Sequence, residues 1–329
     1  MVSHIRWKCF QFFLSVLLVC VFLHVEIKST PAQSLRPMVV AVSTAVDESS
    51  SPIRIAKTLG YFKDEGIDAR LVVMRSDLQV AGLVSGDVAL AASVSSVAKA
   101  AAVGVPVKIV MSFLNGTLFY LVTRPDITSI QELKGKIVAV SRFGSATDFD
   151  ARAALRHFGL DPARDVKILA VGAGGNRLAS LVSKRVDAAI LGAVEKFPAE
   201  AAGFKTLLAT GQYNRQPLGG VGASVERIRG SREELAGALK ALYRALGVMK
   251  SDPSLVKSIF EKELRLKPDQ AEGLYDAMMK VFLPDGEINT RDLSGPYEDA
   301  RKAATNPPPV SLSDLVDWSI LRDVRARAK

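Results

Sequence analysis

The chain has 329 residues, of which 48% are hydrophobic, and its formal net charge is +9 at pH 7. This length and apolar content exclude a chain that is disordered throughout and indicate either one two-lobed domain or two ordinary domains. The basic residues are scattered, without long runs or interleaved aromatic residues, so nucleic acid is not an expected partner.

The first 34 residues have the three regions of a secretory signal peptide. Arg6 and Lys8 precede an apolar stretch at 10–23, and small residues follow it. We expect cleavage after Ser34, which would release a periplasmic protein with a net charge of +7. The alternative is an uncleaved membrane anchor, because the apolar stretch approaches the roughly 20 residues that span a bilayer.

Cysteine and histidine are almost absent from the expected mature chain. Cys9 and Cys20 both lie in the signal segment, and His157 is the one histidine beyond it. Disulfides, thiolate nucleophiles and cysteine metal sites are therefore not expected in the mature protein. We predict neither a metal site nor a cofactor, and interpret His157 as an ordinary helix residue.

Short apolar runs alternate with helical stretches from residue 36 onward. In the first half this pattern predicts strands at 38–42, 69–74, 87–92 and 107–113, and helices at 51–62, 79–86 and 95–104. In the second half it predicts strands at 136–140, 166–172 and 186–192, and helices from Ser145, at 176–185 and at 195–203. Strict alternation is typical of a parallel sheet covered by helices on both faces.

The two halves also resemble each other in sequence. Residues 81–96 can be laid over 179–194, so that Asp87 and Asp187 open equivalent strands. This offset is too long for a solenoid repeat and favours two similar α/β lobes. Extended stretches at 115–126 and 216–230 would connect them as a hinge. We therefore expect a signal peptide at 1–34, a first lobe at 35–122 and 222–329, and a second lobe at 123–221. The helical tail beyond residue 231 should pack on the first lobe.

Hydroxyl-bearing turns follow several predicted strands and lead into helices. In open α/β sheets, ligands bind outside the carboxyl ends of the strands, where helix N-termini offer free N–H groups. The candidate ligand-binding residues in such turns are Ser49, Ser50, Ser51, Ser93, Ser95, Gly144, Ser145, Ala146 and Thr147. Ser51 and Ser145 also fit as helix caps, and Asp148 completes something close to a capping box with Ser145.

Five further residues are candidates for contact with a ligand, each with a structural alternative. Arg142 could pair with a carboxylate or sulfonate, or point to solvent. Gly174, in GAGGNR, could belong to an anion-binding nest or to a simple turn. Glu195 could accept a hydrogen bond from a solute or be solvated. Phe113 and Asn115 could line a cleft, or belong to the core and to a turn.

Taken together, LGYFKDEGIDARLV at 59–72, LVSGDVALAA at 83–92, IQELKGKIVAVSRFGSATD at 130–148 and HFGLDPARDVKILAVG at 157–172 resemble the solute-binding proteins of ABC importers. The resemblance is to the branch with nitrate, sulfonate and taurine binders and relatives of thiamine-precursor binders. It covers roughly residues 38–300. It implies a type II periplasmic-binding-protein fold, with two α/β lobes, two hinge connections and a small polar or anionic solute held in the cleft.

The resemblance also implies the partners of the protein, namely the solute and an ABC permease in the inner membrane, and we expect a monomer. A sensor that reports ligand occupancy to a membrane partner is an alternative. An enzyme is not expected, because the mature chain lacks the motifs of activated nucleophiles and metal hydrolases. Fungal thiamine-precursor synthases share the fold but use a cysteine-rich motif that this chain lacks.

Overall fold

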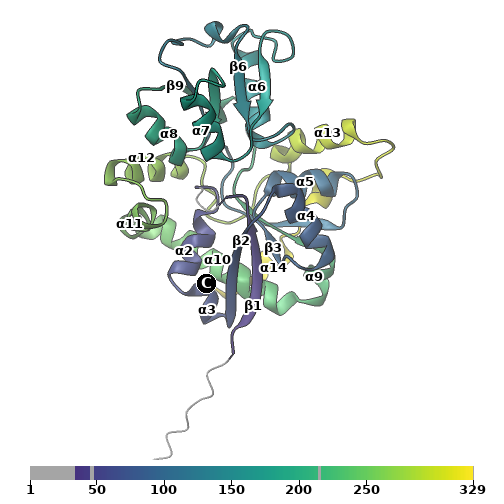
Figure 1. The fold of residues 1–329 in the computed structure, drawn as a ribbon. Helices are drawn as coiled ribbons and strands as arrows, with labels where there is room; N and C mark the ends of the chain where they lie inside the picture. The colour runs from purple at the N-terminus through teal and green to yellow at the C-terminus, as the bar shows by residue number, and fades with distance from the viewer. Residues whose placement is uncertain (1–33, 45–47, 214–215, 329) are drawn as a thin grey trace, which may run out of the picture. The chain divides into compact units, whose positions relative to one another are not determined.

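The computed structural model describes residues 34–44, 48–213 and 216–328, so the predicted signal peptide and its cleavage site lie outside the described residues, apart from Ser34. Two five-stranded sheets organise this part of the chain (Figure 1). We call each sheet with its covering helices a lobe. The two α/β units expected from the sequence are present.

The first sheet has the strand order β2-β1-β3-β10-β4. Its strands are β1 (Arg36–Val42), β2 (Ile67–Val73), β3 (Leu90–Ala91), β4 (Val107–Ser112) and β10 (Gly220–Ser224). The helices between and after these strands are α2 (Ser51–Thr58), α3 (Tyr61–Asp64), α4 (Ser76–Ser85), α5 (Val94–Ala102) and α9 (Val225–Gly230). The helix expected at 51–62 is divided because Gly60 adopts a left-handed φ of 76°.

The second sheet has the order β7-β6-β8-β5-β9. Its strands are β5 (Tyr120–Thr123), β6 (Ile137–Val140), β7 (Lys167–Ala170), β8 (Ala188–Leu191) and β9 (Lys205–Ala209). Its helices are α6 (Ala146–His157), α7 (Gly174–Val182) and α8 (Ala193–Ala201), with 3-10 turns η1 (Gln131–Leu133) and η2 (Thr210–Gln212). Sequence analysis did not predict β9.

The sheets are mixed, which corrects the expectation of parallel strands. β10 runs antiparallel to β3 and β4, and β5 runs antiparallel to β8 and β9. Each antiparallel strand is the fourth in its sheet. Each is also the first strand after the chain passes from one lobe to the other. The expected boundaries at 122–123 and 221–222 both fall inside these strands, and the stretch at 216–230, expected to be extended, contains α9.

The repeat detected in the sequence occupies equivalent places in the two lobes. The segment from α4 through β3 into α5 corresponds to α7, β8 and α8, and β3 and β8 are each third in their sheet. Leu83 and Leu181, aligned in the sequence, are both buried. The helix-strand-helix unit and its burial pattern are therefore shared by both lobes.

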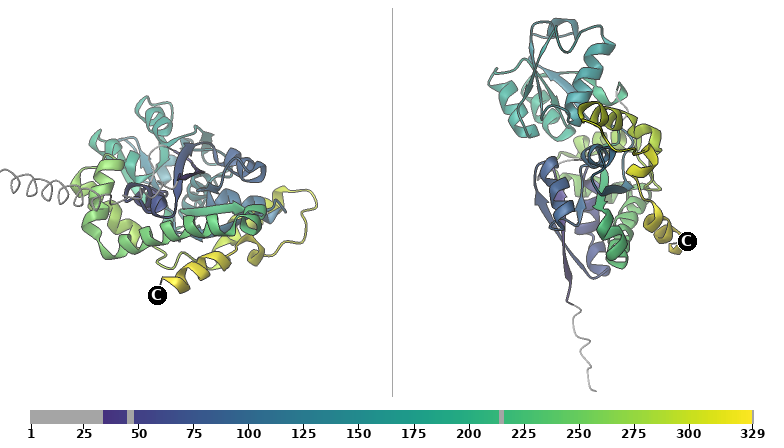
Figure 2. Two further views of the ribbon diagram at one scale, coloured as in Figure 1. Left: turned by 90° about the horizontal axis from the view of Figure 1, so that it is seen from below. Right: turned by 90° about the vertical axis from the view of Figure 1, so that its right-hand side faces the viewer.

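The C-terminal helices extend the core of the first lobe, as expected. They are α10 (Arg232–Ser251), α11 (Pro253–Glu263), α12 (Pro268–Met279), α13 (Ser294–Ala303) and α14 (Ser319–Arg327), with η3 (Thr290–Leu293) and η4 (Leu312–Leu315). Leu235, Leu239, Leu242 and Leu246 form the buried stripe of α10 within the first-lobe core. The long α10 packs against α2 and α14, and Figure 2 shows α14 beside it.

Candidate functional site

A cavity of about 290 Å³ is lined by residues of both lobes. In the first lobe these residues lie in the segments after β1, β2 and β3, and in the second lobe after β6, β7 and β8. Phe119 and Leu218, from the two connections between the lobes, complete the lining. The cavity therefore lies where parallel strands end and helices begin, the position at which α/β proteins bind ligands.

The structure brings many of the predicted residues together in this lining: Ser49, Ser93, Ser95, Arg142, Ser145, Ala146, Thr147, Gly174 and Glu195. They come from both lobes and from loops far apart in the sequence. Whether they contact a ligand remains a prediction.

The two serines at the start of α2 lie outside the lining. Ser50 and Ser51 are each 1% exposed. Ser50 is the N-cap residue, in place of the expected Ser51, and its Oγ accepts a hydrogen bond from Arg54 Nε at 3.2 Å. Both serines are therefore left out of the ligand site proposed below.

Three other candidates also lie outside the lining. Phe113 is fully buried in the first-lobe core. Asn115 donates from Nδ2 to Asp292 Oδ2 at 3.0 Å, which ties the first connection to the C-terminal region. The Gly144 carbonyl accepts a hydrogen bond from Lys99 Nζ. Phe113 therefore lies in the core, and Asn115 lies in a bend that bonds to the C-terminal region.

The N-terminus of α6 is built as the capping interpretation predicted. Ser145 is the N-cap residue and its side chain accepts from the Asp148 N–H, while Asp148 Oδ2 accepts from the Gly144 N–H at 2.9 Å. Ser145 Oγ also lies 2.8 Å from Ser141 Oγ and 2.9 Å from Thr147 Oγ1. These hydroxyls bond to one another and to the backbone, so the described contacts give none of them a basic partner that would activate it as a nucleophile.

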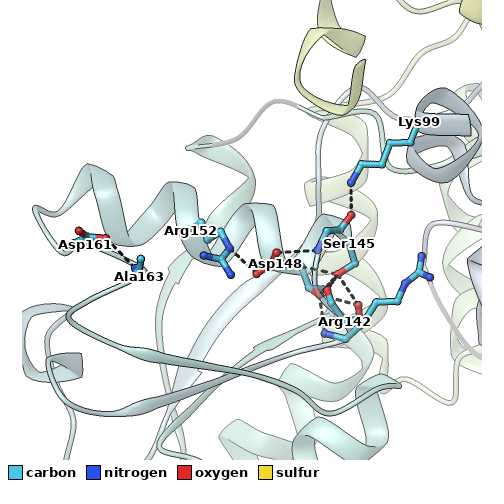
Figure 3. Close-up of polar contacts among 10 residues, drawn as sticks. Lys99, Arg142, Ser145, Asp148, Arg152, Asp161 and Ala163 are labelled. Carbon is cyan, nitrogen blue, oxygen red and sulfur yellow. Dashed lines mark hydrogen bonds and ion pairs between the residues drawn. The ribbon is translucent and has the colours of Figure 1, made fainter. Parts of the chain in front are cut away.

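Arg142 contacts the opposite lobe. Its guanidinium pairs with Asp77 Oδ1 at 3.2 Å and donates to the Ser76 and Ser96 hydroxyls of α4 and α5. Figure 3 shows its side chain extending away from α6, and shows Lys99 reaching toward the same loop. We call these contacts, together with the Lys99 to Gly144 hydrogen bond, the α6 contact group.

Lys99 has an unusual environment in this group. Its ammonium lies 3.9 Å from the centroid of the Phe149 ring. Burial lowers the pKa of Lys99 from 10.5 to about 8, and Asp299 opposes this shift while Arg142 adds to it. The charged form of Lys99 is therefore less favourable in the folded protein than in the unfolded chain.

A second set of contacts between the lobes surrounds the N-terminus of α8. Glu48, from the β1–α2 loop, accepts a hydrogen bond through Oε1 from the Ala193 N–H at 3.2 Å. Arg177 of α7 is 5% exposed and donates from Nε to the Ile190 carbonyl at 2.7 Å. Glu195 lies on the first turn of α8. We call Glu48, Arg177, Ala193 and Glu195 the α8 contact group.

Burial lowers the pKa of Arg177, whereas Glu195 and Glu48 act in the opposite direction. These two carboxylates are therefore close enough to stabilise the buried guanidinium.

Sequence analysis did not select several residues of the lining, including Glu48, Arg75 and Ser76. Ser76 follows a predicted strand and could have been found by the rule that identified Ser93, Ser95 and Ser96. Glu48 gave no local signal, because its partner Ala193 lies on another element.

Among the described residues, no helix is long and apolar enough to span a membrane. The same part of the chain contains no group of three or more histidine, cysteine, aspartate or glutamate side chains placed to hold a metal ion.

Comparison with solved structures confirms the type II periplasmic-binding fold predicted from the sequence. The periplasmic aliphatic sulphonate binding protein SsuA of Escherichia coli is 15% identical to this chain and has a TM-score of 0.67. The match covers 85% of this chain and 92% of the SsuA chain. The periplasmic sulfonate-binding protein SsuA of Methylobacillus flagellatus KT is 17% identical, with coverages of 90% and 95% and a TM-score of 0.67.

The desulfurization enzyme DSZB is 15% identical, with coverages of 89% and 100% and a TM-score of 0.63, so the fold also carries catalysis. No significant match is found among curated proteins. The profile of the NMT1/THI5-like family matches residues 48–254, and the chain belongs to that family.

Proposed function

We propose that this protein is the exported solute-binding component of an ABC importer. It holds a small polar solute in the cavity between its lobes and delivers it to a permease in the inner membrane. The observation that carries the proposal is a single cavity lined by three strand-following loops from each lobe. The sulfonate-binding function named for the two SsuA proteins supports it.

Binding without chemistry accounts for the lining better than catalysis does. The described lining holds serines, arginines and glutamates but neither cysteine nor histidine. The α6 hydroxyls are bonded to one another. A solute that touches both lobes would bind the closed form better than the open form, and this difference in affinity drives closure.

A thermal-shift screen of residues 35–329 tests the proposal. The compounds are sulfonates, nitrate, carboxylates, pyrimidines and aromatic acids. A ligand at 100 times its Kd adds about 2.7 kcal/mol to the free energy of unfolding, which is a shift of several degrees in Tm. We expect at least one compound to produce that shift without being converted to product.

Two matched variants show whether the shift arises in the cavity. Ala146→Trp fills the cavity at the start of α6 and should abolish the shift. Ala163→Trp places the same side chain at an exposed site near the far end of α6 (Figure 3) and should retain it. Conversion of the compound to product would contradict the proposal, as would a shift that survives Ala146→Trp. Delivery is tested by solute uptake into vesicles that contain the permease.

A further inference from the structure

A buried carboxylate of the second lobe bonds to both connections between the lobes. The first connection lies between β4 and β5, and the second lies between β9 and β10. Asp150, on α6, is 0% exposed, and its Oδ2 accepts hydrogen bonds from Thr117 Oγ1 at 2.5 Å and from Thr210 Oγ1 at 2.7 Å. Thr117 belongs to the first connection and Thr210 to the second. One carboxylate oxygen therefore joins the two connections.

The two connections also contact each other at this point. A Cβ atom built on Gly211 would lie 2.2 Å from the Thr117 carbonyl oxygen, so glycine lets the two backbones approach this closely. Farther along the second connection, the Tyr213 ring lies 4.5 Å from the His157 ring at the end of α6, measured between centroids. These contacts hold Thr117 and residues 210–213 on the second lobe.

The first connection changes its lobe partner between two consecutive residues. The Asn115 N–H donates to the Val281 carbonyl at 2.7 Å, and a Cβ atom built on Gly116 would lie 2.7 Å from Val281 Cγ1. Val281 packs against the first-lobe core. Thr117, the next residue, bonds to Asp150 of the second lobe. Because opposite lobes hold Gly116 and Thr117, the backbone torsions at this junction must take up a rotation between the lobes.

Asp150 is connected to the cavity through α6. Ser145, Ala146 and Thr147 at the start of α6 line the cavity, and Asp150 lies about one helical turn farther along, outside the lining. The backbone hydrogen bonds of a helix hold successive turns together. The cavity wall at α6 and the parts of both connections that Asp150 holds therefore form one body.

We propose that Asp150 is a positioning residue, which holds both connections to α6 so that the lobes rotate about the junction of Gly116 and Thr117 while the cavity wall at α6 stays intact. This inference rests on the proposed function for the rotation itself. It goes beyond that function in naming the residue and the junction that control the rotation. Without the hydrogen bond from Thr117, the first connection would bend at several residues, and the lobes would sample a wider range of relative orientations.

Distances between spin labels test the proposal without a solute. The chain has no cysteine beyond Cys20, so cysteines introduced into residues 35–329 can be labelled selectively. Asp276→Cys on α12 of the first lobe and Ala201→Cys on α8 of the second lobe use exposed sites. Double electron–electron resonance gives the distribution of distances between the two labels. We expect a narrow distribution when no other residue is changed.

Removal of the Thr117 hydroxyl should loosen the junction. Thr117→Val keeps the shape of the side chain but cannot donate to Asp150, so the distribution should become at least about twice as broad. Asp150→Asn should broaden it as well. Thr117→Ser keeps the donor and should keep the distribution narrow. Leu181→Ala removes buried apolar packing from α7 instead, so it should lower stability but also keep the distribution narrow.

The Thr117 variants decide the test even if Asp150→Asn does not fold. A distribution in Thr117→Val as narrow as that of the protein without this change would overturn the inference. Equal broadening in Thr117→Ser or in Leu181→Ala would also overturn it, because a general loss of packing would then explain the result. A screen in which no compound raises Tm would overturn the proposed function but would leave these widths unchanged.

Discussion

The Arg142–Asp77 pair of the α6 contact group and the α8 contact group join the same two lobes but differ in their burial. In the α6 contact group, the Arg142 and Asp77 side chains are 37% and 45% exposed, so solvent and salt screen their attraction. In the α8 contact group, Glu48 and Arg177 are 3% and 5% exposed. Forming or breaking an exposed contact changes the free energy of the protein little. Removing one charge of a buried group costs more, because the remaining charges stay buried without it.

This difference suggests a division of roles between two regions that local sequence alone would make equivalent. Both groups form at helix N-termini that follow parallel strands. Under the proposed function, the α6 contact group is suited to adjust the balance of open and closed forms. The α8 contact group is suited to tie ligand recognition to the integrity of the second lobe.

The largest expected effect comes from removal of the buried guanidinium. Arg177→Ala leaves the Ile190 and Gly172 carbonyls without its N–H donors and removes the positive charge that interacts with Glu48 and Glu195. We expect the free energy of unfolding to fall by about 3–5 kcal/mol in urea denaturation.

The control for this prediction is Arg185→Ala, which removes an exposed arginine and should change stability by no more than about 0.5 kcal/mol. Equal losses in the two variants would mean that the α8 contact group is no stronger than an exposed surface contact.

The next effect depends on pH and on Lys99. Its pKa in the folded protein is about 8, below the ordinary 10.5, so the folded state releases this proton first as pH rises. The unfolded state then binds more protons between these values, and stability should rise with pH in this window. Relative to Lys99→Met, the wild type should gain on the order of 1 kcal/mol from pH 8 to pH 10.5, after allowance for solvent screening.

Denaturant unfolding at a series of pH values measures this gain. Lys63→Met provides the comparison, since Lys63 is exposed on α3. A pH dependence that is the same in wild type and Lys99→Met would contradict the assigned role of burial at Lys99.

The smallest effect is expected from Asp77→Asn, which removes the exposed pairing of Asp77 with Arg142 across the lobes. Stability should fall by about 0.2–1 kcal/mol at low salt and by less at 1 M salt. The radius of gyration of the free protein should increase, because one contact between lobes is lost.

Asp68→Asn is the matched variant, because Asp68 pairs with Arg70 within the first lobe. It should leave the radius of gyration unchanged. An increase in both variants, or in neither, would show that the Arg142 pair does not influence closure.

Much of the fold could be predicted from local patterns. Apolar runs located most strands, and Ser145 with Asp148 located the start of α6, because these features depend on residues close in the sequence. β9 was missed and the sheets were expected to be parallel, because the direction of β5 and β10 depends on the path of the chain between lobes.

The candidate site could be predicted only in part. The rule that ligands bind beyond strand ends found Ser93, Ser95 and Ser145. It also selected Ser50, which is buried and accepts a hydrogen bond from Arg54. Arg142, a candidate because of its charge, lines the cavity and pairs with Asp77 of the opposite lobe. A local pattern identifies the end of a strand but does not determine which way each side chain points.

The sequence by itself determined the type of each lobe, the repeated helix-strand-helix unit and the hydroxyl-rich helix starts, since these follow from periodicity and capping over a few residues. Only the tertiary structure decided that Glu48 meets Ala193, and that Arg142 meets Asp77. Those meetings join residues of different lobes, and their positions depend on how the two connections bring the lobes together.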